Sequence, residues 1–304
     1  EGKIYEYLDS REQFFAEKHG IVKYYASRWM PRPPIISPPM LEEAIRTLGE
    51  NRKNPNRNYP RELGIVKQLF QLARADLGEV PPLFDYQLSD LMLQLNNHMG
   101  NTEKALVHGE RAIAALKQQP HTRDNYQRSL ETRLRMSGIE TNRFNFLGAI
   151  KILSDELAPL LQFRLESSDL DDFGPQIDPT LGKCYSALGQ NYAYLKKHDD
   201  ALKSFNRSLN HFAAEPENME ITITHILHLA LSKSDINLFE RFAPSYFNDT
   251  SDNLGTPERR WQRRWQDAIE SKNPYKLLVL LKAINIMESV KEKRVLERFL
   301  NADY

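Results

Sequence analysis

Three side chains in this sequence are of types that often support catalysis or metal binding: His225, His228 and Cys184. His225 and His228 lie three residues apart in THILHLAL, a spacing at which one helix can present two imidazoles to a metal ion. Because no Asp, Glu or Cys accompanies them at helical spacing, a packed or solvated pair is favoured. Cys184 has no recognisable Cys-His-Asn context, which favours a packed thiol over a nucleophile.

Common catalytic motifs are also missing from the sequence. It contains no G-x-S-x-G, H-E-x-x-H, P-loop or G-x-G-x-x-G pattern. We therefore expect a protein that is not an enzyme, with no cofactor and no metal site.

A basic and aromatic stretch, TPERRWQRRWQDAIE, carries the strongest signal for a ligand. It contains Arg259, Arg260, Arg263, Arg264, Trp261 and Trp265. Positive charge beside stacking surfaces suits phosphate groups or single-stranded nucleic acid. The alternative, which we favour, is an amphipathic helix whose tryptophans pack on the preceding hairpin while arginine stems cover its edges. Ala268 and Ile269 continue the apolar side in that interpretation.

Charge balance and cysteine content narrow the class of protein. The 304 residues contain 41 Lys plus Arg and 41 Asp plus Glu, so no global field attracts nucleic acid or an acidic membrane. One cysteine excludes an internal disulfide and favours a reducing compartment. No segment has the length and apolar character of a signal or a membrane span. We expect a cytoplasmic protein.

Helical periodicity dominates the chain, because apolar residues recur at i, i+3, i+4 and i+7 and no run alternates as a strand does. N-cap candidates, several followed by Pro, delimit helices of ordinary length: Ser10, Ser37, Asn58, Thr256 and Asn273. The sequence predicts an all-α fold in three parts. These are an N-terminal helical segment over 1–80, an array of helix pairs over 84–247, and C-terminal helices over 256–304 that cap the array or mediate association.

The stretch YSALGQNYAYLKKHDDALKSF carries a repeat pattern. Its spacing is W-x2-L-G-x2-Y…A-x3-F, with the first aromatic replaced by tyrosine, at Tyr185, Leu188, Gly189, Tyr192, Ala201 and Phe205. This stretch resembles a tetratricopeptide repeat (TPR), a pair of antiparallel helices. Small residues at Gly189 and Ala201 would let the two helices approach closely.

Fainter copies of the pattern lie on either side. Upstream, Ala105, Gly109 and Ala112 match the small second-helix positions, but Leu93 stands where a small residue is expected, which predicts a wider hairpin. Ser137 and Ala149 mark a third copy, and 217–242 has the length and periodicity of a fourth. The resemblance implies an α-solenoid, a superhelical array of TPR-like hairpins with a concave working face.

First helices line the concave face in TPR proteins, which assigns candidate partner-binding positions. In the best copy these include Lys183, Ser186, Gln190 and Tyr194, with Ala193. In the upstream copy they are Gln87, Asp90, Gln94, Asn97 and His98. Mostly neutral hydrogen-bonding groups suit a peptide backbone or a partner helix. The Lys, Arg and Asn of the family's carboxylate clamp are not reproduced here.

We expect a protein- or peptide-binding scaffold, adaptor or sensor module of a larger regulatory system. A nucleic-acid-associated regulator using residues 258–269 is the alternative. The apolar run LLVLLKAINIM also allows a homodimer through the C-terminal helices.

Overall fold

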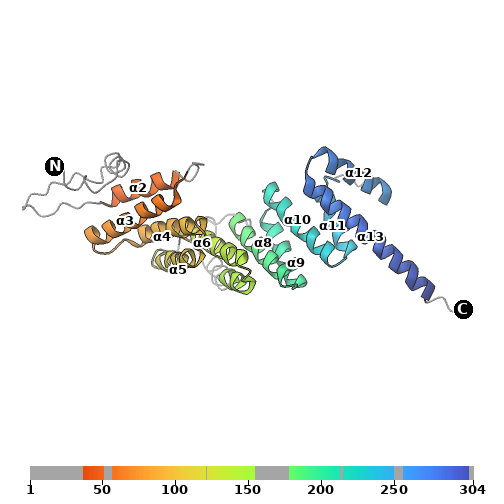
Figure 1. The fold of residues 1–304 in the computed structure, drawn as a ribbon, viewed down its shortest axis with the longest axis horizontal. Helices are drawn as coiled ribbons and strands as arrows, with labels where there is room; N and C mark the ends of the chain where they lie inside the picture. The colour runs from red at the N-terminus through yellow and green to blue at the C-terminus, as the bar shows by residue number, and fades with distance from the viewer. Residues whose placement is uncertain are drawn as a thin grey trace, which may run out of the picture. The chain divides into compact units, whose positions relative to one another are not determined.

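The computed structural model describes residues 37–50, 57–120, 122–154, 178–212, 215–249 and 256–300, except the side chains of 290 and 292–300. Every element in these ranges is helical, and no strand occurs in them. The predicted all-α fold of antiparallel helical hairpins is therefore confirmed (Figure 1). The first part of the predicted N-terminal segment, with Ser10, lies outside the described residues. None of the described helices has the length and hydropathy needed to span a bilayer.

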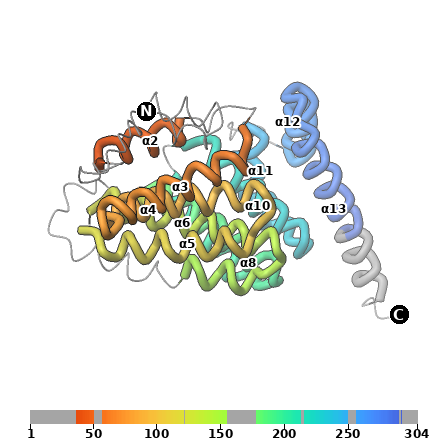
Figure 2. The backbone as a smooth tube through the Cα atoms, turned by 60° about the vertical axis from the view of Figure 1, so that its left-hand side comes forward, coloured from red at the N-terminus to blue at the C-terminus, as the bar shows by residue number. Residues whose placement is uncertain are grey.

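Contacts divide the chain into two compact units, 1–139 and 140–304, and the division falls within α6. In the first unit the helices are α2 (Pro38–Glu50), α3 (Tyr59–Leu77), α4 (Pro82–His98), α5 (Thr102–Leu116) and most of α6 (Arg123–Asn142). The second unit contains helical residues 146–154, α8 (Pro179–Tyr194), α9 (His198–His211), α10 (Pro216–Ser232), α11 (Ile236–Tyr246), α12 (Pro257–Glu270) and α13 (Pro274–Leu300). In each unit helices that follow one another lie side by side (Figures 1 and 2).

Several helix starts follow from the predicted caps. The side chains of Asn58, Thr256 and Asn273 accept hydrogen bonds from backbone N–H groups in the first turns of α3, α12 and α13. Ser37 directly precedes α2, and its carbonyl accepts from the N–H of Leu41. A proline in the first turn of these helices has no N–H of its own that would need a partner there.

A residue in the left-handed backbone conformation marks the turn of each hairpin. These turn residues are Gly100 (φ 76°), Phe144 (φ 60°), Lys196 (φ 58°), Ser234 (φ 54°) and Lys272 (φ 52°). In the first four hairpins the next N–H bonds back to a carbonyl near the end of the first helix, as Lys197 does to Tyr192 at 2.9 Å. The turn residue therefore provides a common register for hairpins whose sequences differ.

This register explains why the fourth hairpin, α10–α11, shows no repeat motif. Ala105, Ala149 and Ala201 stand five residues after Gly100, Phe144 and Lys196. The same place after Ser234 holds Phe239, which is completely buried. The hairpin is therefore retained although a phenylalanine stands where the repeat motif has its most diagnostic small residue.

Within a hairpin, a large residue and a small residue fit together where the two helices cross. These two residues stand seven positions before and nine positions after the turn residue. In α8–α9 this pair is Gly189 and Phe205, and a Cβ atom added at 189 would stand 2.5 Å from the ring. In α4–α5 the large residue comes first. A Cβ atom added at Gly109 would stand 2.7 Å from the side chain of Leu93. The predicted widening at Leu93 is therefore absent, since Gly109 provides the space.

The second unit follows the same size rule in α10–α11, where Leu227 stands with Ala243 in one buried cluster. Ser137 and Leu153 also occupy these two places in the sequence, and both are buried. We call these places the crossing pair; in the four hairpins described so far, one member is small.

Candidate functional site

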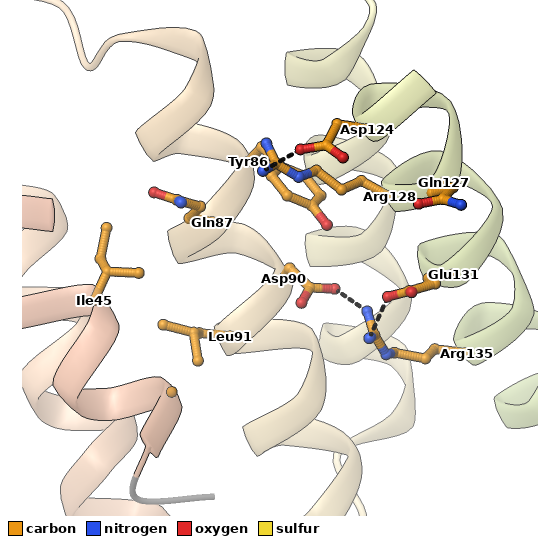
Figure 3. Close-up of a pocket in the computed structure, with 11 residues that line it drawn as sticks. Ile45, Tyr86, Gln87, Asp90, Leu91, Asp124, Gln127, Arg128, Glu131 and Arg135 are labelled. Atoms are coloured by element: carbon orange, nitrogen blue, oxygen red, sulfur yellow. Dashed lines mark hydrogen bonds and ion pairs between the residues drawn. The ribbon is translucent and has the colours of Figure 1, made fainter. Parts of the chain in front are cut away.

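A groove of about 450 Å³ lies in the first unit between α2, α4 and α6 (Figure 3). The side of the groove next to α2 is apolar, with Ile45 and Leu91. The remaining lining is mostly polar and charged, from α4 and α6: Tyr86, Gln87, Asp90, Asp124, Gln127, Arg128, Glu131 and Arg135. The helices that form it are α2 and the first helices of two consecutive hairpins.

An ion-pair network joins α4 to α6 in this groove. Arg135 Nη1 donates to Asp90 Oδ1 at 2.7 Å, and its Nη2 donates to Glu131 at 3.1 Å. Figure 3 shows these three side chains pointing toward one another. Asp90 is buried, and Gln94 also donates to it at 2.6 Å. Asp90 is therefore out of reach of a ligand in the groove. A ligand could bind this network only through Arg135 and Glu131, which would then also keep their present partners.

A second polar group lies toward the start of α6. Arg128 pairs with Asp124 at 3.5 Å and lies over the ring of Tyr86. Burial raises the pKa of Tyr86 to about 12, with Asp90 adding to the effect, so this phenol stays neutral. Gln87 projects between α4 and α2 (Figure 3), and its buried Oε1 has no hydrogen-bond partner among the described residues. Because that oxygen is buried, the Gln87 side chain would have to turn before an N–H donor in the groove could satisfy it.

Two of the five positions predicted on α4 line this groove, Gln87 and Asp90. Gln94 supports Asp90 from one turn away. Asn97 is exposed, and His98 stacks on Tyr59 of α3 with ring centroids 4.9 Å apart. Of the five predicted positions, two therefore line the groove, one supports a groove residue, one packs on α3 and one is exposed.

The positions predicted on α8 have different environments. Ser186 is buried and accepts from Thr222 of α10 at 3.4 Å, so a partner cannot reach it in this arrangement. Gln190 hydrogen-bonds His225 of α10 at 2.7 Å. Lys183 is exposed, whereas Ala193 is only partly so. Tyr194 is 58% exposed and stacks on Phe146 at 4.8 Å.

Sequence reasoning missed the α6 side of the groove. A stripe of alternating charge, Asp124, Arg128, Glu131 and Arg135, repeats at three and four residues along α6. That spacing places the four residues on one helix face and could have identified it. The contribution of Ile45 from α2 had no comparable sequence signal, because it depends on how α2 packs on α4.

The basic and aromatic residues of α12 are divided between the interior and the surface. Arg264 is completely buried, with Nε 2.6 Å from Asp249 Oδ2 and two Nη atoms 3.1 and 3.2 Å from Glu240. Trp261 stacks on Phe239 of α11 at 6.0 Å, as the packing alternative expects. The expectation that arginine stems cover the edges of the tryptophan face is wrong for Arg264, which is buried. The placement of Ile269 on the packed side is also wrong, since 57% of it is exposed.

The repeat register gives the physical reason for the buried arginine. Arg264 stands eight residues before its turn residue, where the other hairpins bury Met92, Met136, Leu188 and Ile226. Burying a guanidinium there requires paired carboxylates. Arg259, Arg260, Arg263 and Trp265 remain exposed, and their binding of an anion stays a prediction.

His225 and Cys184 are packed in the second unit, with His225 stacked on Phe205, whereas His228 is exposed. Burial raises the pKa of Cys184 to about 12, with Asp178 adding to the effect, which keeps the thiol protonated and unreactive. Burial also lowers the pKa of His225 to about 4, with His228 contributing. Among the described residues, no group of three or more His, Cys, Asp or Glu could hold a metal ion.

Comparison with known proteins identifies no family. No protein-family model matches the sequence, and no curated protein matches it. Solved structures that are similar to the chain include the following two. BtubC (BKLC) from P. vanneervenii is 13% identical with a TM-score of 0.48, and the similarity covers 87% of this chain and 93% of that one. The apo form of RapI is 15% identical with a TM-score of 0.48, covering 86% of this chain and 73% of that one.

Proposed function

We propose that the chain is a non-enzymatic, TPR-like scaffold that binds a protein or peptide as an adaptor or sensor of a larger regulatory system. The observation that carries this proposal is the groove between α2, α4 and α6, which contains Gln87 and Asp90 at the positions expected for a concave face. The groove combines an apolar side with hydrogen-bonding groups, the combination that peptide recognition requires.

The polar side favours a partner that brings both hydrogen-bond donors and acceptors. Gln87 Oε1 has no hydrogen-bond partner among the described residues, and if the side chain turned toward the groove this oxygen would accept from a backbone N–H of an extended segment. Arg128 lies over Tyr86 with a long contact to Asp124, so its guanidinium can bind a carbonyl or carboxylate without breaking a short ion pair. Ile45 and Leu91 would cover an apolar side chain of the same segment.

Selection of binders from a random peptide library on the whole chain tests this proposal. Selected peptides are labelled, and their dissociation constants are measured by fluorescence anisotropy for the wild type and for Gln87→Ala and Glu131→Lys. We expect each groove variant to weaken binding by about tenfold, which corresponds to ~1.4 kcal/mol.

Glu110→Lys provides the matched control, because it makes the same charge change on an exposed position of α5. It should leave binding unchanged, and thermal unfolding of all variants checks that the fold is retained. Failure to select any binder, or binding by both groove variants that is as strong as binding by the wild type, would rule out the groove as the recognition surface.

A further inference from the structure

The acidic side chains that α6 contributes to the groove are more exposed than the basic ones. The side chain of Asp124 is 76% exposed and that of Glu131 is 50% exposed. Those of Arg128 and Arg135 are 33% and 32% exposed. Both arginines contact α4, Arg128 through an aromatic ring and Arg135 through the buried Asp90. A ligand that enters the groove therefore meets carboxylates on α6 before it meets guanidinium groups.

Glu131 is the carboxylate with room for a further partner. Arg135 donates to its Oε2 at 3.1 Å and to Asp90 at a shorter 2.7 Å, so one guanidinium serves two carboxylates. Nothing in the described part of the chain donates to Glu131 Oε1. With both carboxylates ionised, the three side chains keep one negative charge more than Arg135 can balance. A cation in the groove would supply the missing charge through a charge-assisted hydrogen bond.

The other cations of α6 have different contacts. Arg128 stands one turn before Glu131 and pairs with Asp124 at 3.5 Å. Arg123 and Arg133 do not line the groove. Within the described residues, Arg135 is therefore the cation of α6 that is hydrogen-bonded to Glu131.

Basic residues on the α2 side of the groove are also paired or undescribed. Arg46, next to the lining residue 45, is held between Glu43 and Glu50 at 2.7 and 2.5 Å. Arg52 and Lys53, which follow α2, lie outside the described residues, and a measurement on the whole chain includes their effect. The described part of α2 thus supplies no hydrogen bond to Glu131.

The apolar side of the groove suits the stem of a long basic side chain. Ile45 and Leu91 lie across the groove from Glu131 (Figure 3). The methylene groups of lysine or arginine can pack on apolar side chains while the charged end reaches an acceptor. An acidic side chain at the same place would instead face Glu131 and Asp124 with like charge, which disfavours binding.

We propose that the segment bound in the groove presents a basic side chain, lysine or arginine, to Glu131. This inference rests on the proposed peptide-binding function and adds the class of residue that the groove selects. The ammonium or guanidinium group donates to Glu131 Oε1, while Arg135 keeps its bonds to Oε2 and to Asp90. No hydrogen bond of the network has to break when the ligand enters.

Peptides selected from a random library on the whole chain test this inference. Lysine or arginine should be enriched at one position relative to the unselected library. Replacing that residue by its neutral counterpart, citrulline for arginine or norleucine for lysine, should raise the dissociation constant by about tenfold, and Glu131→Gln should do the same. The two changes together should cost no more than either alone, because they remove the same ion pair. Fluorescence anisotropy measures all four combinations.

Glu110→Gln is the matched control, because it removes a carboxylate from an exposed position of α5 and should leave binding unchanged. Thermal unfolding checks that each variant keeps its fold. Binders that weaken in Gln87→Ala but need no basic residue, or a neutral peptide whose loss of affinity is independent of Glu131→Gln, would overturn this inference and leave peptide binding in the groove standing. A library that yields no binder would overturn both.

Discussion

Gly189 and Phe205 meet at the crossing point of α8 and α9, with the ring occupying the space where a side chain at 189 would begin. Leu93 and Gly109 repeat this relationship with the sizes exchanged. The two hairpins therefore reach the same close approach with opposite assignments of large and small residues.

Replacing Gly189 by alanine should overpack α8 against α9. Three ring atoms of Phe205 lie within 2.9 Å of the new Cβ position, so the ring or the helix must shift at a cost of about 1–3 kcal/mol. Chemical denaturation measures the change. Gly138→Ala on α6 is the control, because nothing lies within 4 Å of its Cβ position and alanine should stabilise the helix by ~0.5–1 kcal/mol. Equal effects of the two variants would refute the crossing contact.

Substitutions at Gly109 and Leu93, the crossing pair of α4–α5, should be strongly coupled in their effects on the unfolding free energy. Gly109→Ala should destabilise the chain because the new Cβ would meet Leu93 and Met136. Combined with Leu93→Ala, the same change should cost less than the sum of the two single variants, with a coupling of about 0.5–3 kcal/mol. A double-mutant cycle measured by urea unfolding provides the value, and simple additivity would contradict the size rule.

Removing the buried guanidinium should be far more damaging than removing a surface charge. Arg264→Met leaves Asp249 buried without its partner and should lower the unfolding free energy by about 3–5 kcal/mol. Adding Asp249→Asn and Glu240→Gln should recover most of the loss, because the other hairpins bury apolar residues at this place. If Arg264→Met alone unfolds like the wild type, the ion pairs contribute nothing to holding α12.

Acid should destabilise the second unit through His225. The pKa of this histidine is lowered from 6.5 to about 4 by burial, so the unfolded state binds more protons between these values. Stability should be full above pH 6.5 and fall as the pH decreases toward 4, by at most ~3 kcal/mol from this group. Unfolding of His225→Gln measured over the same range should show a smaller slope, and an unchanged slope would exclude this group as the cause.

Hairpin architecture was largely predictable, because apolar periodicity and N-caps act locally. Asn58 and Thr256 were identified as caps from residue type and position alone, and both accept the expected hydrogen bonds. The hairpin at Ser234 lost its motif because Phe239 replaced a diagnostic alanine, although its turn kept the same backbone conformation. For this hairpin, the backbone conformation of the turn identifies the repeat, whereas the residue type at position 239 does not.

The residues that line the groove were predictable only where they depended on the repeat register. Asp90 and Gln87 followed from the repeat, whereas the facing charges on α6 and the wall from α2 depend on packing between elements. Arg264 was placed at the surface because arginine is usually there. Its burial depends on Glu240 and Asp249, which are remote in sequence and supply its counter-charges.

The common turn geometry has a consequence for changes in chain length. Within each hairpin three residues separate the two helices, as at 195–197 and 233–235, and the middle one is in the left-handed conformation. Two connections between hairpins differ in length, with four residues at 212–215 and ten at 247–256. An added residue in a turn would shift the crossing pair out of register, whereas one in a connection leaves it intact. Insertions and fused domains are thus compatible with the fold at the connections and incompatible with it at the turns.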